Sequence, residues 1–171
     1  MTFSSKPLVL VLGSGGQVGR FVVERLAHAS EEIHVRITAR TPDRVAALHA
    51  AGHDTVLLDL DRPSTFAAAL RGVERVFLLT GYTVAMLAQS KMFVDAARKA
   101  SVQHIVHLGT FGQWDCTDPH IVWHQLVETY IKASGIAWTH LHPNMFMEQL
   151  PKLMPIRNVS RSTGARTEWA G

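Results

Sequence analysis

The stretch GSGGQVG, residues 13–19, is the segment whose residue types and spacing point most directly to chemistry. It follows the apolar run LVLVL (8–12), which is typical of a buried parallel strand. Free N–H groups at the following helix N-terminus, together with the helix dipole, would face an incoming anion. An ordinary tight turn is the alternative. The spacing G-x-x-G-x-x-G favours the pyrophosphate of a dinucleotide, and the residues predicted to hold it are Gly13, Ser14, Gly15, Gly16, Gln17, Val18 and Gly19.

The end of the second predicted strand bears on which dinucleotide binds. A site for NAD(H) would place Asp or Glu there to bind the ribose 2′-hydroxyl. The sequence instead reads TARTPDR (38–44), with Arg40 and Arg44 and no carboxylate before Asp43. A guanidinium suits a 2′-phosphate, because it can donate two hydrogen bonds to it. We therefore favour NADP(H) over NAD(H), with solvated surface arginines as the alternative.

Strand-like and helix-like segments alternate along the chain, and these elements must position the loop. The predicted strands cover 8–12, 33–39, 55–60, 75–80, 104–109 and 137–142. Helices are expected over 16–29, 41–52, 63–72, 85–100 and 118–135. Such alternation predicts an α/β fold, a doubly wound parallel six-stranded Rossmann sheet with helices on both faces. We expect residues 1–150 to form this domain and residues 151–171 to be a basic, loosely structured extension.

Composition excludes several classes of protein. Hydrophobic residues make up 47% and charged residues 18% of the chain, a globular balance without an apolar run of membrane-spanning length. No export signal is visible and Cys116 is the only cysteine, which fits a cytoplasmic protein. The net charge of +3 arises in residues 151–171. Nucleic-acid binding is not expected, because aromatic residues do not interleave with these charges.

Five stretches occur in order along the chain: LGSGGQVGRFVVERL, ITARTPDR, LDL, AARKASVQHIVHLGT and SGIAWTHLHPNMFMEQL. Together they resemble the NmrA-like branch of the atypical short-chain dehydrogenase/reductases, and the resemblance spans residues 8 to about 150. It implies a cofactor along the carboxyl ends of the strands. The implied contacts are Gly13 to Gly19 with the pyrophosphate, Arg40 with the adenosine phosphate, Asp59 and Leu60 with the adenine edge, Thr80 and Gly81 with the ribose region, and Thr110, Pro143, Asn144 and Met145 with the nicotinamide.

The chain departs from that family at the catalytic pair. Catalytic members use Tyr-x-x-x-Lys on the fifth helix, where the tyrosine passes a proton to the substrate oxygen. His120 and His124 stand at those two places, and a histidine can donate a proton near neutral pH. Thr110 is the predicted hydroxyl partner of the substrate oxygen. His142 stands where the family commonly has arginine.

Metal binding is a further reading of these histidines. The pairs His120/His124 and His140/His142 could each chelate an ion. No Glu follows His120 as in the metalloprotease motif, and no cysteine cluster accompanies any of these histidines. No metal site is therefore expected.

The leading hypothesis is an NADP(H)-dependent oxidoreductase acting on a small carbonyl or quinone. Family members usually continue into a smaller C-terminal part that closes over the substrate. A chain without it is either a truncated enzyme or a protein that binds the cofactor for another purpose. The rival hypothesis is therefore a non-catalytic NADP(H)-sensing regulator that binds a protein partner. A degenerate fold that no longer binds a cofactor is ranked last. A homo-oligomer is also open, whereas a membrane partner is not expected.

Overall fold

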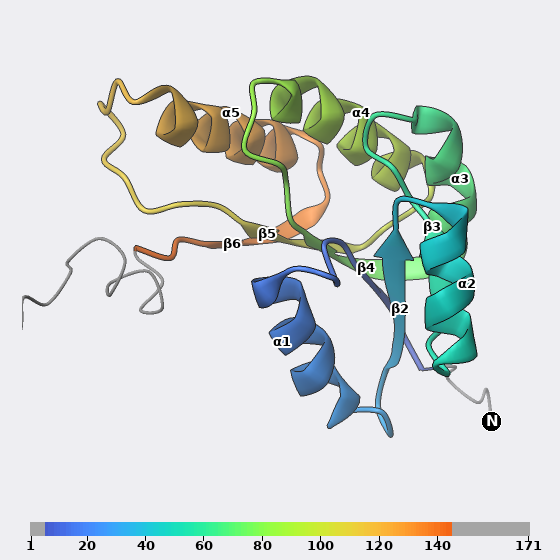
Figure 1. Ribbon diagram of the computed structural model, residues 1–171. Helices are drawn as coiled ribbons and strands as arrows, with labels where there is room; N and C mark the ends of the chain where they lie inside the picture. The colour runs from blue at the N-terminus through green and yellow to red at the C-terminus, as the bar shows by residue number, and fades with distance from the viewer. Residues whose placement is uncertain (1–5, 145–171) are drawn as a thin grey trace, which may run out of the picture.

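The computed structural model describes residues 6–144, which form a parallel six-stranded sheet with the order β3-β2-β1-β4-β5-β6 (Figure 1). The strands are β1 (Leu8–Val11), β2 (His34–Ala39), β3 (Thr55–Leu57), β4 (Val73–Leu78), β5 (His104–Leu108) and β6 (Ala137–Leu141). The predicted α/β fold and parallel six-stranded sheet are confirmed. Met145 and residues 151–171, which carried further predictions, lie outside the described residues.

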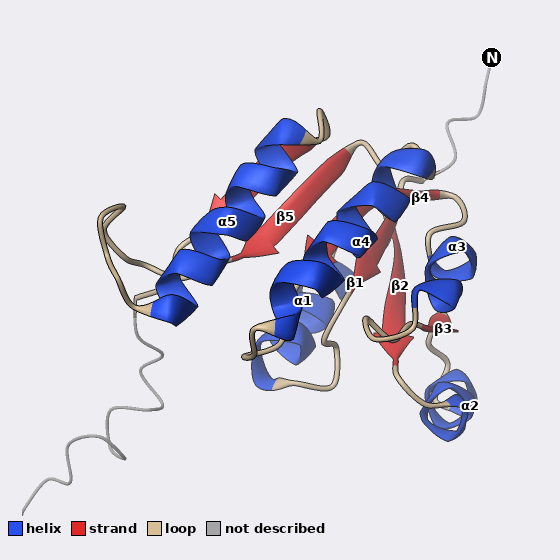
Figure 2. Ribbon diagram, turned by 90° about the horizontal axis from the view of Figure 1, so that it is seen from above, coloured by secondary structure: helices blue, strands red, loops and turns tan. Residues whose placement is uncertain are grey.

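Helices cover both faces of the sheet, as predicted. They are α1 (Gln17–Ala27), α2 (Pro42–Ala50), α3 (Phe66–Ala69) preceded by a 3₁₀ turn at Pro63–Thr65, α4 (Ala85–Lys99) and α5 (Pro119–Ala133). Helices α3, α4 and α5 lie side by side over one face, and α1 lies on the other (Figures 1 and 2). Helix α2 contacts β2 and β3. Among helices within residues 6–144, none is long and apolar enough to cross a membrane.

Local signals set the helix boundaries. The hydroxyl of Thr41 accepts a hydrogen bond from the Arg44 amide at 3.4 Å, and Pro42 opens α2. Asp118 caps α5 in the same way. Helices α2, α3 and α5 are followed by glycines with positive φ, at Gly52, Gly72 and Gly135, a conformation that glycine adopts without strain.

Two strand predictions were wrong at an end by two residues or more, and the other four by one residue. Strand β4 begins at Val73, which pairs with Leu8, and ends at Leu78 rather than at Thr80. The apolar run continues beyond the strand because Leu79 packs against Gly13 instead of pairing. Strand β3 ends at Leu57, because the next residues turn and the Asp59 amide donates to the hydroxyl of Thr65.

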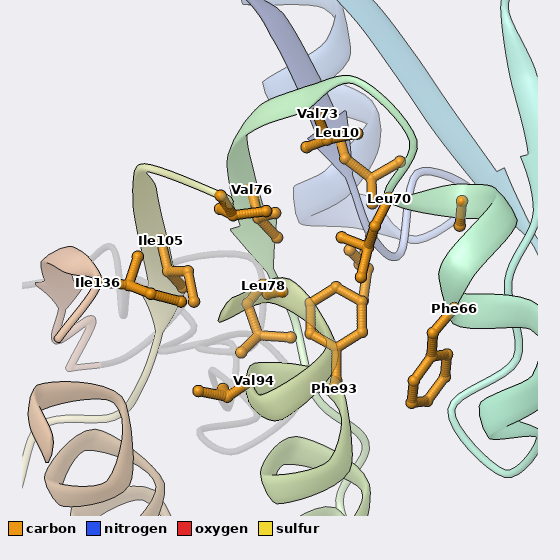
Figure 3. Packing of buried hydrophobic residues seen from close by; sticks show 14 of the residues in the cluster. Leu10, Phe66, Leu70, Val73, Val76, Leu78, Phe93, Val94, Ile105 and Ile136 are labelled. Carbon is orange, nitrogen blue, oxygen red and sulfur yellow. The ribbon is translucent and has the colours of Figure 1, made fainter. Parts of the chain in front are cut away.

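The core lies between the sheet and helices α3, α4 and α5 (Figure 3). Its largest members are fully buried, and the rings of Phe66 and Phe93 meet edge to face with centroids 5.5 Å apart. This packing holds the strands in register, so the segments after their carboxyl ends emerge along one edge of the sheet. On α1, by contrast, Phe21 is 49% exposed.

Candidate functional site

The predicted site residues lie along one edge of the molecule because they follow the carboxyl ends of parallel strands. Gly13 follows β1, Arg40 follows β2, and Thr110 follows β5. The strand order reverses between β1 and β4, and ligands of open α/β sheets bind in the crevice at such a reversal. The glycine loop, residues 13–19, therefore occupies the position where this fold binds ligands.

The glycine loop is a tight turn with a helix N-terminus at its end. Gly13 has φ +69°, and its carbonyl oxygen accepts a hydrogen bond from the Gly16 amide at 2.9 Å. Ser14 Oγ donates to the carbonyl oxygen of Thr38 at 3.0 Å, which ties the loop to β2. Gly16 is the N-cap of α1, and no side chain caps the helix. The first-turn amides and the positive end of the helix dipole therefore suit an anion.

Gly19 explains why the third glycine falls where it does. A Cβ atom at Gly19 would overlap the carbonyl oxygen of Gly13, so any larger residue must displace the loop. Around Gly15, by contrast, a Cβ would meet nothing within 4 Å. The loop is thus closely packed on its helix side and open around Gly15, which leaves room for the backbone approach that a pyrophosphate needs.

At the adenosine end of the predicted site, some side chains already pair with neighbouring residues of the chain. Arg40 is exposed at the end of β2, where a phosphate could reach it. Asp59 Oδ2 pairs with Arg62 Nε at 3.0 Å, and its Oδ1 accepts from the Asp61 amide. Leu60 packs against the core. Asp59 is thus paired within residues 6–144, whereas Arg40 is left free there to bind a ligand.

The loops after β5 and β6 are joined by main-chain hydrogen bonds. The Gly109 amide donates to the Leu141 carbonyl at 2.9 Å, and the Phe111 amide donates to the Pro143 carbonyl at 3.1 Å. Thr110 therefore lies beside the segment that holds Pro143 and Asn144. The sequence predicted both segments at the nicotinamide end, and the structure brings them together.

His120 and His124 occupy different environments although they lie one turn apart on α5. His120 is partly exposed, its ring centroid 3.8 Å from that of Tyr82, and burial lowers its pKa. His124 is buried, with Nδ1 3.4 Å from Nε2 of His107 on β5. Burial, and then the charge of nearby His120, lowers the pKa of His124 to about 4. At neutral pH a protonated His124 is scarce, so His120 is the better placed proton donor.

Sequence reasoning missed a cluster of polar groups beneath α5. His107 on β5 is fully buried, and its register partner on β6 is His140. Glu128 on α5 is buried, and its Oε1 lies 2.8 Å from Nε2 of His142. Burial lowers the pKa of His107 to about 3 and also lowers that of His140. Alternation along both strands could have placed the histidines on one face, but only the β5–β6 register pairs them.

Comparison with known proteins identifies the family. Residues 13–164 match a family model described as NAD(P)H-binding. The NAD(P)H azoreductase of Xenophilus azovorans is 31% identical over 144 residues, covering 84% of this chain and 50% of the relative. Quinone oxidoreductase 2 of Escherichia coli (strain K12) is 26% identical over 146 residues, covering 82% of this chain and 50% of the relative.

The fold comparison agrees. An Escherichia coli NADPH-dependent quinone oxidoreductase, solved in complex with NADPH, superposes with a TM-score of 0.76 at 24% identity, covering 86% of this chain and 52% of that one. The chain spans about half the length of the curated relatives it matches, which include an NmrA-like oxidoreductase. The resemblance found in the sequence is confirmed. The chain therefore belongs to the NAD(P)H-binding family, which has a Rossmann fold here, and an NmrA-like oxidoreductase is among its relatives.

Proposed function

We propose that the protein is an NADP(H)-dependent reductase that transfers hydride to a quinone or a related small carbonyl compound. The single observation that carries the proposal is the glycine loop, whose Gly13 turn and Gly19 packing place an uncapped helix N-terminus at the strand-order reversal. Relatives named as an azoreductase and a quinone oxidoreductase support the reaction class.

Cofactor choice follows from Arg40. In this proposal the amides of the glycine loop bind the pyrophosphate, and the Arg40 guanidinium binds the 2′-phosphate of the adenosine ribose. No acidic side chain stands at the end of β2 to bind a 2′-hydroxyl, since Thr41 and Pro42 come next. NADPH is thereby preferred over NADH.

Exposed aromatic side chains lie in two of the segments that follow strands at the carboxyl edge of the sheet. Tyr82, in the segment after β4, is 74% exposed, and Phe111 and Trp114, after β5, are 59% and 72% exposed. Flat rings stack on flat conjugated ligands. Exposed rings in these two segments favour a quinone over an aliphatic carbonyl compound.

Proton transfer is assigned to the chain's own residues. Bound nicotinamide supplies the hydride, and a quinone then needs one proton to become the hydroquinone. Thr110, at the carboxyl end of β5, would bind the acceptor oxygen through its hydroxyl group. His120, beside Tyr82 and partly exposed, would donate the proton and be reprotonated from water.

Turnover with a model acceptor tests the proposal. The chain is mixed with NADPH and benzoquinone, and the loss of NADPH absorbance gives kcat and KM. His120→Gln should lower kcat about 100-fold, the lower end of the effect of a general acid. His49→Gln, at an exposed histidine in the last turn of α2, is the matched control. A His120→Gln variant with unchanged kcat would remove His120 from the mechanism.

One observation favours the second candidate, a cofactor-sensing regulator. His124 stands where catalytic relatives have lysine, but its ring is buried against His107. In that case the chain would bind NADPH without turning over any quinone. Binding of NADPH by a folded sample that shows no reduction of several quinones and aldehydes would support the regulator.

A further inference from the structure

The polar cluster beneath α5 is not used by the proposed reductase. It comprises His107 on β5, Glu128 on α5, and His140 and His142 on and after β6. Polar groups under a helix normally satisfy one another or bind water or an ion, because burying them without partners costs free energy. The atoms of this cluster that lack hydrogen-bond partners therefore indicate what it could bind.

Three of these side chains converge from three elements. One ligand atom each from His107, Glu128 and His140 all lie within 4.8 Å of one another. The β5–β6 register sets His107 beside His140, and α5 brings Glu128 over them. Gly109 makes room for this arrangement, since a Cβ there would lie 2.6 Å from Glu128 Oε1. The cluster is thus held by the sheet register and by the packing of α5.

Several nitrogens in the cluster have no partner. His107 is fully buried and its Nδ1 makes no hydrogen bond. Both ring nitrogens of His140 are also buried and without a partner. Each orphaned buried nitrogen costs free energy, because it gives up its hydrogen bonds to water and gains none in the protein. A metal ion bound through a lone pair on each imidazole would remove part of this cost.

We propose that His107, Glu128 and His140 bind one divalent transition-metal ion, with Zn²⁺ as the best match. Two imidazole nitrogens and one carboxylate oxygen are a donor set that Zn²⁺ accepts, whereas Ca²⁺ and Mg²⁺ prefer oxygen ligands. In a tetrahedral zinc site the donor atoms are about 3.4 Å apart, so each pair of the three ligand atoms, now within 4.8 Å, must approach by at most about 1.4 Å. The fourth position is left for water or another ligand.

Neighbouring histidines orient two of the three ligands. His142 Nε2 lies 2.8 Å from Glu128 Oε1, and His124 Nδ1 lies 3.4 Å from His107 Nε2. Such outer contacts fix the direction of metal ligands in known sites. The His142 side chain is 46% exposed, which provides a path for an ion from solvent to Glu128. Neither Arg40 nor the glycine loop takes part, so metal binding does not depend on the proposed reductase activity.

Cobalt binding by the full chain tests the site. The tag-free protein is stripped with EDTA, dialysed and titrated with Co²⁺, whose visible absorption is intense in tetrahedral coordination, and then with Zn²⁺ as competitor. We expect one Co²⁺ per chain and its displacement by one Zn²⁺. Glu128→Gln and His140→Gln should each weaken binding at least 10-fold. His53→Gln changes an exposed histidine outside the cluster and should leave binding unchanged.

Two results would overturn the site. The first is a wild-type chain that binds no stoichiometric Co²⁺ or Zn²⁺, a result that needs no variant to fold. The second is binding that both cluster variants retain, or that His53→Gln removes, because surface histidines would then hold the ion. Circular dichroism checks the fold of each variant. Titration of the same samples with NADPH keeps the outcome separate from that of the cofactor site.

Discussion

His107 shows how burial sets the chemistry of a single side chain. It is enclosed by the sheet and α5, with His124 facing it from the helix and His140 from the adjacent strand. Glu128 and His142 complete the surroundings, at the end of the cluster near Gly109. Burial, followed by the charges of the other histidines, lowers the pKa of His107 to about 3. His107 is therefore neutral in the folded protein at any pH near neutrality.

A pH dependence of stability follows. In the unfolded chain the pKa of His107 returns to about 6.5. Below that pH the unfolded state therefore binds a proton that the folded state does not bind. The free energy of unfolding should fall as pH falls from about 6.5 toward 3, with His107 accounting for up to about 2 kcal/mol at about pH 5. Urea unfolding at several pH values, with EDTA present, measures this loss.

The matched pair for this test is His107→Gln and His28→Gln. Glutamine cannot be protonated, so His107→Gln should show a smaller loss of stability between about pH 6.5 and 4 than the wild type, whatever its stability at neutral pH. His28 is exposed, and its variant should follow the wild type. An unchanged slope in His107→Gln would show that other groups carry the acid sensitivity.

Single-residue signals in the sequence were informative where they act locally. Thr41 and Asp118 are the first residues of the helices predicted over 41–52 and 118–135, and they hydrogen-bond the first-turn amides of α2 and α5. The His107 cluster was not predicted, because its members are separated along the chain and meet only through strand register and helix packing. Tyr82 was missed for the same reason, since it reaches His120 from another loop.

At the scale of elements, the turn from β1 into α1 depends on one close contact. Gly19→Ala places a Cβ against the Gly13 carbonyl, and a backbone atom cannot move aside as a flexible side chain can. The gain in helix propensity, about 1 kcal/mol, is outweighed by this overlap. We expect a net loss of about 1–3 kcal/mol of stability, the usual cost of overpacking, and weaker NADPH binding.

Gly15→Ala is the control for that loop. Its φ is not positive and a Cβ there meets nothing within 4 Å, so the free energy of unfolding should stay within about 0.5 kcal/mol of wild type. Urea midpoints of the two variants, measured side by side, test the contact. Equal midpoints would mean that the Gly13–Gly19 contact does not constrain the loop.

The start of α5 depends on a side-chain cap. Asp118 Oδ1 accepts hydrogen bonds from the amides of His120 at 2.9 Å and Ile121 at 3.3 Å. Asp118→Ala should cost about 1 kcal/mol, or about 2–4 °C in Tm for a domain of this size. Asp115→Ala removes an exposed carboxylate that caps no helix and should change Tm little. A Tm for Asp118→Ala equal to that of Asp115→Ala would exclude the capping contribution.

Element types were predictable and element ends less so. The alternation of strand-like and helix-like segments identified every strand of the described sheet. The first strand was clearest, since a buried parallel strand reads as a continuous apolar stretch. The same continuity hid the end of β4, because Leu78 and Leu79 are alike in the sequence and differ only in what they contact. Pairing partners, which decide where a strand stops, are non-local.

At the scale of the whole molecule, the strand order follows from the handedness of the connections between strands. Right-handed crossovers between successive parallel strands, with helices on both faces, lead to the observed order with its reversal between β1 and β4 (Figure 2). That reversal brings the glycine loop, Arg40 and Thr110 to one edge, and so the cofactor site could be proposed from the sequence. The acceptor end could be predicted less well, because it is assembled from separate loops.

Binding of NADPH is the measurement that tests the central claim most directly. Calorimetric titration of the chain with NADPH and NADH is repeated with Arg40→Ala and with Arg25→Ala. Removing hydrogen bonds to a charged phosphate costs about 1.5–3 kcal/mol, so Arg40→Ala should lose about 10- to 100-fold in NADPH affinity and nothing for NADH. Arg25→Ala, at an exposed arginine in the last turn of α1, is the control and should bind NADPH like the wild type. A folded chain that binds neither nucleotide, or an Arg40→Ala variant that keeps the wild-type preference for NADPH, would contradict the account.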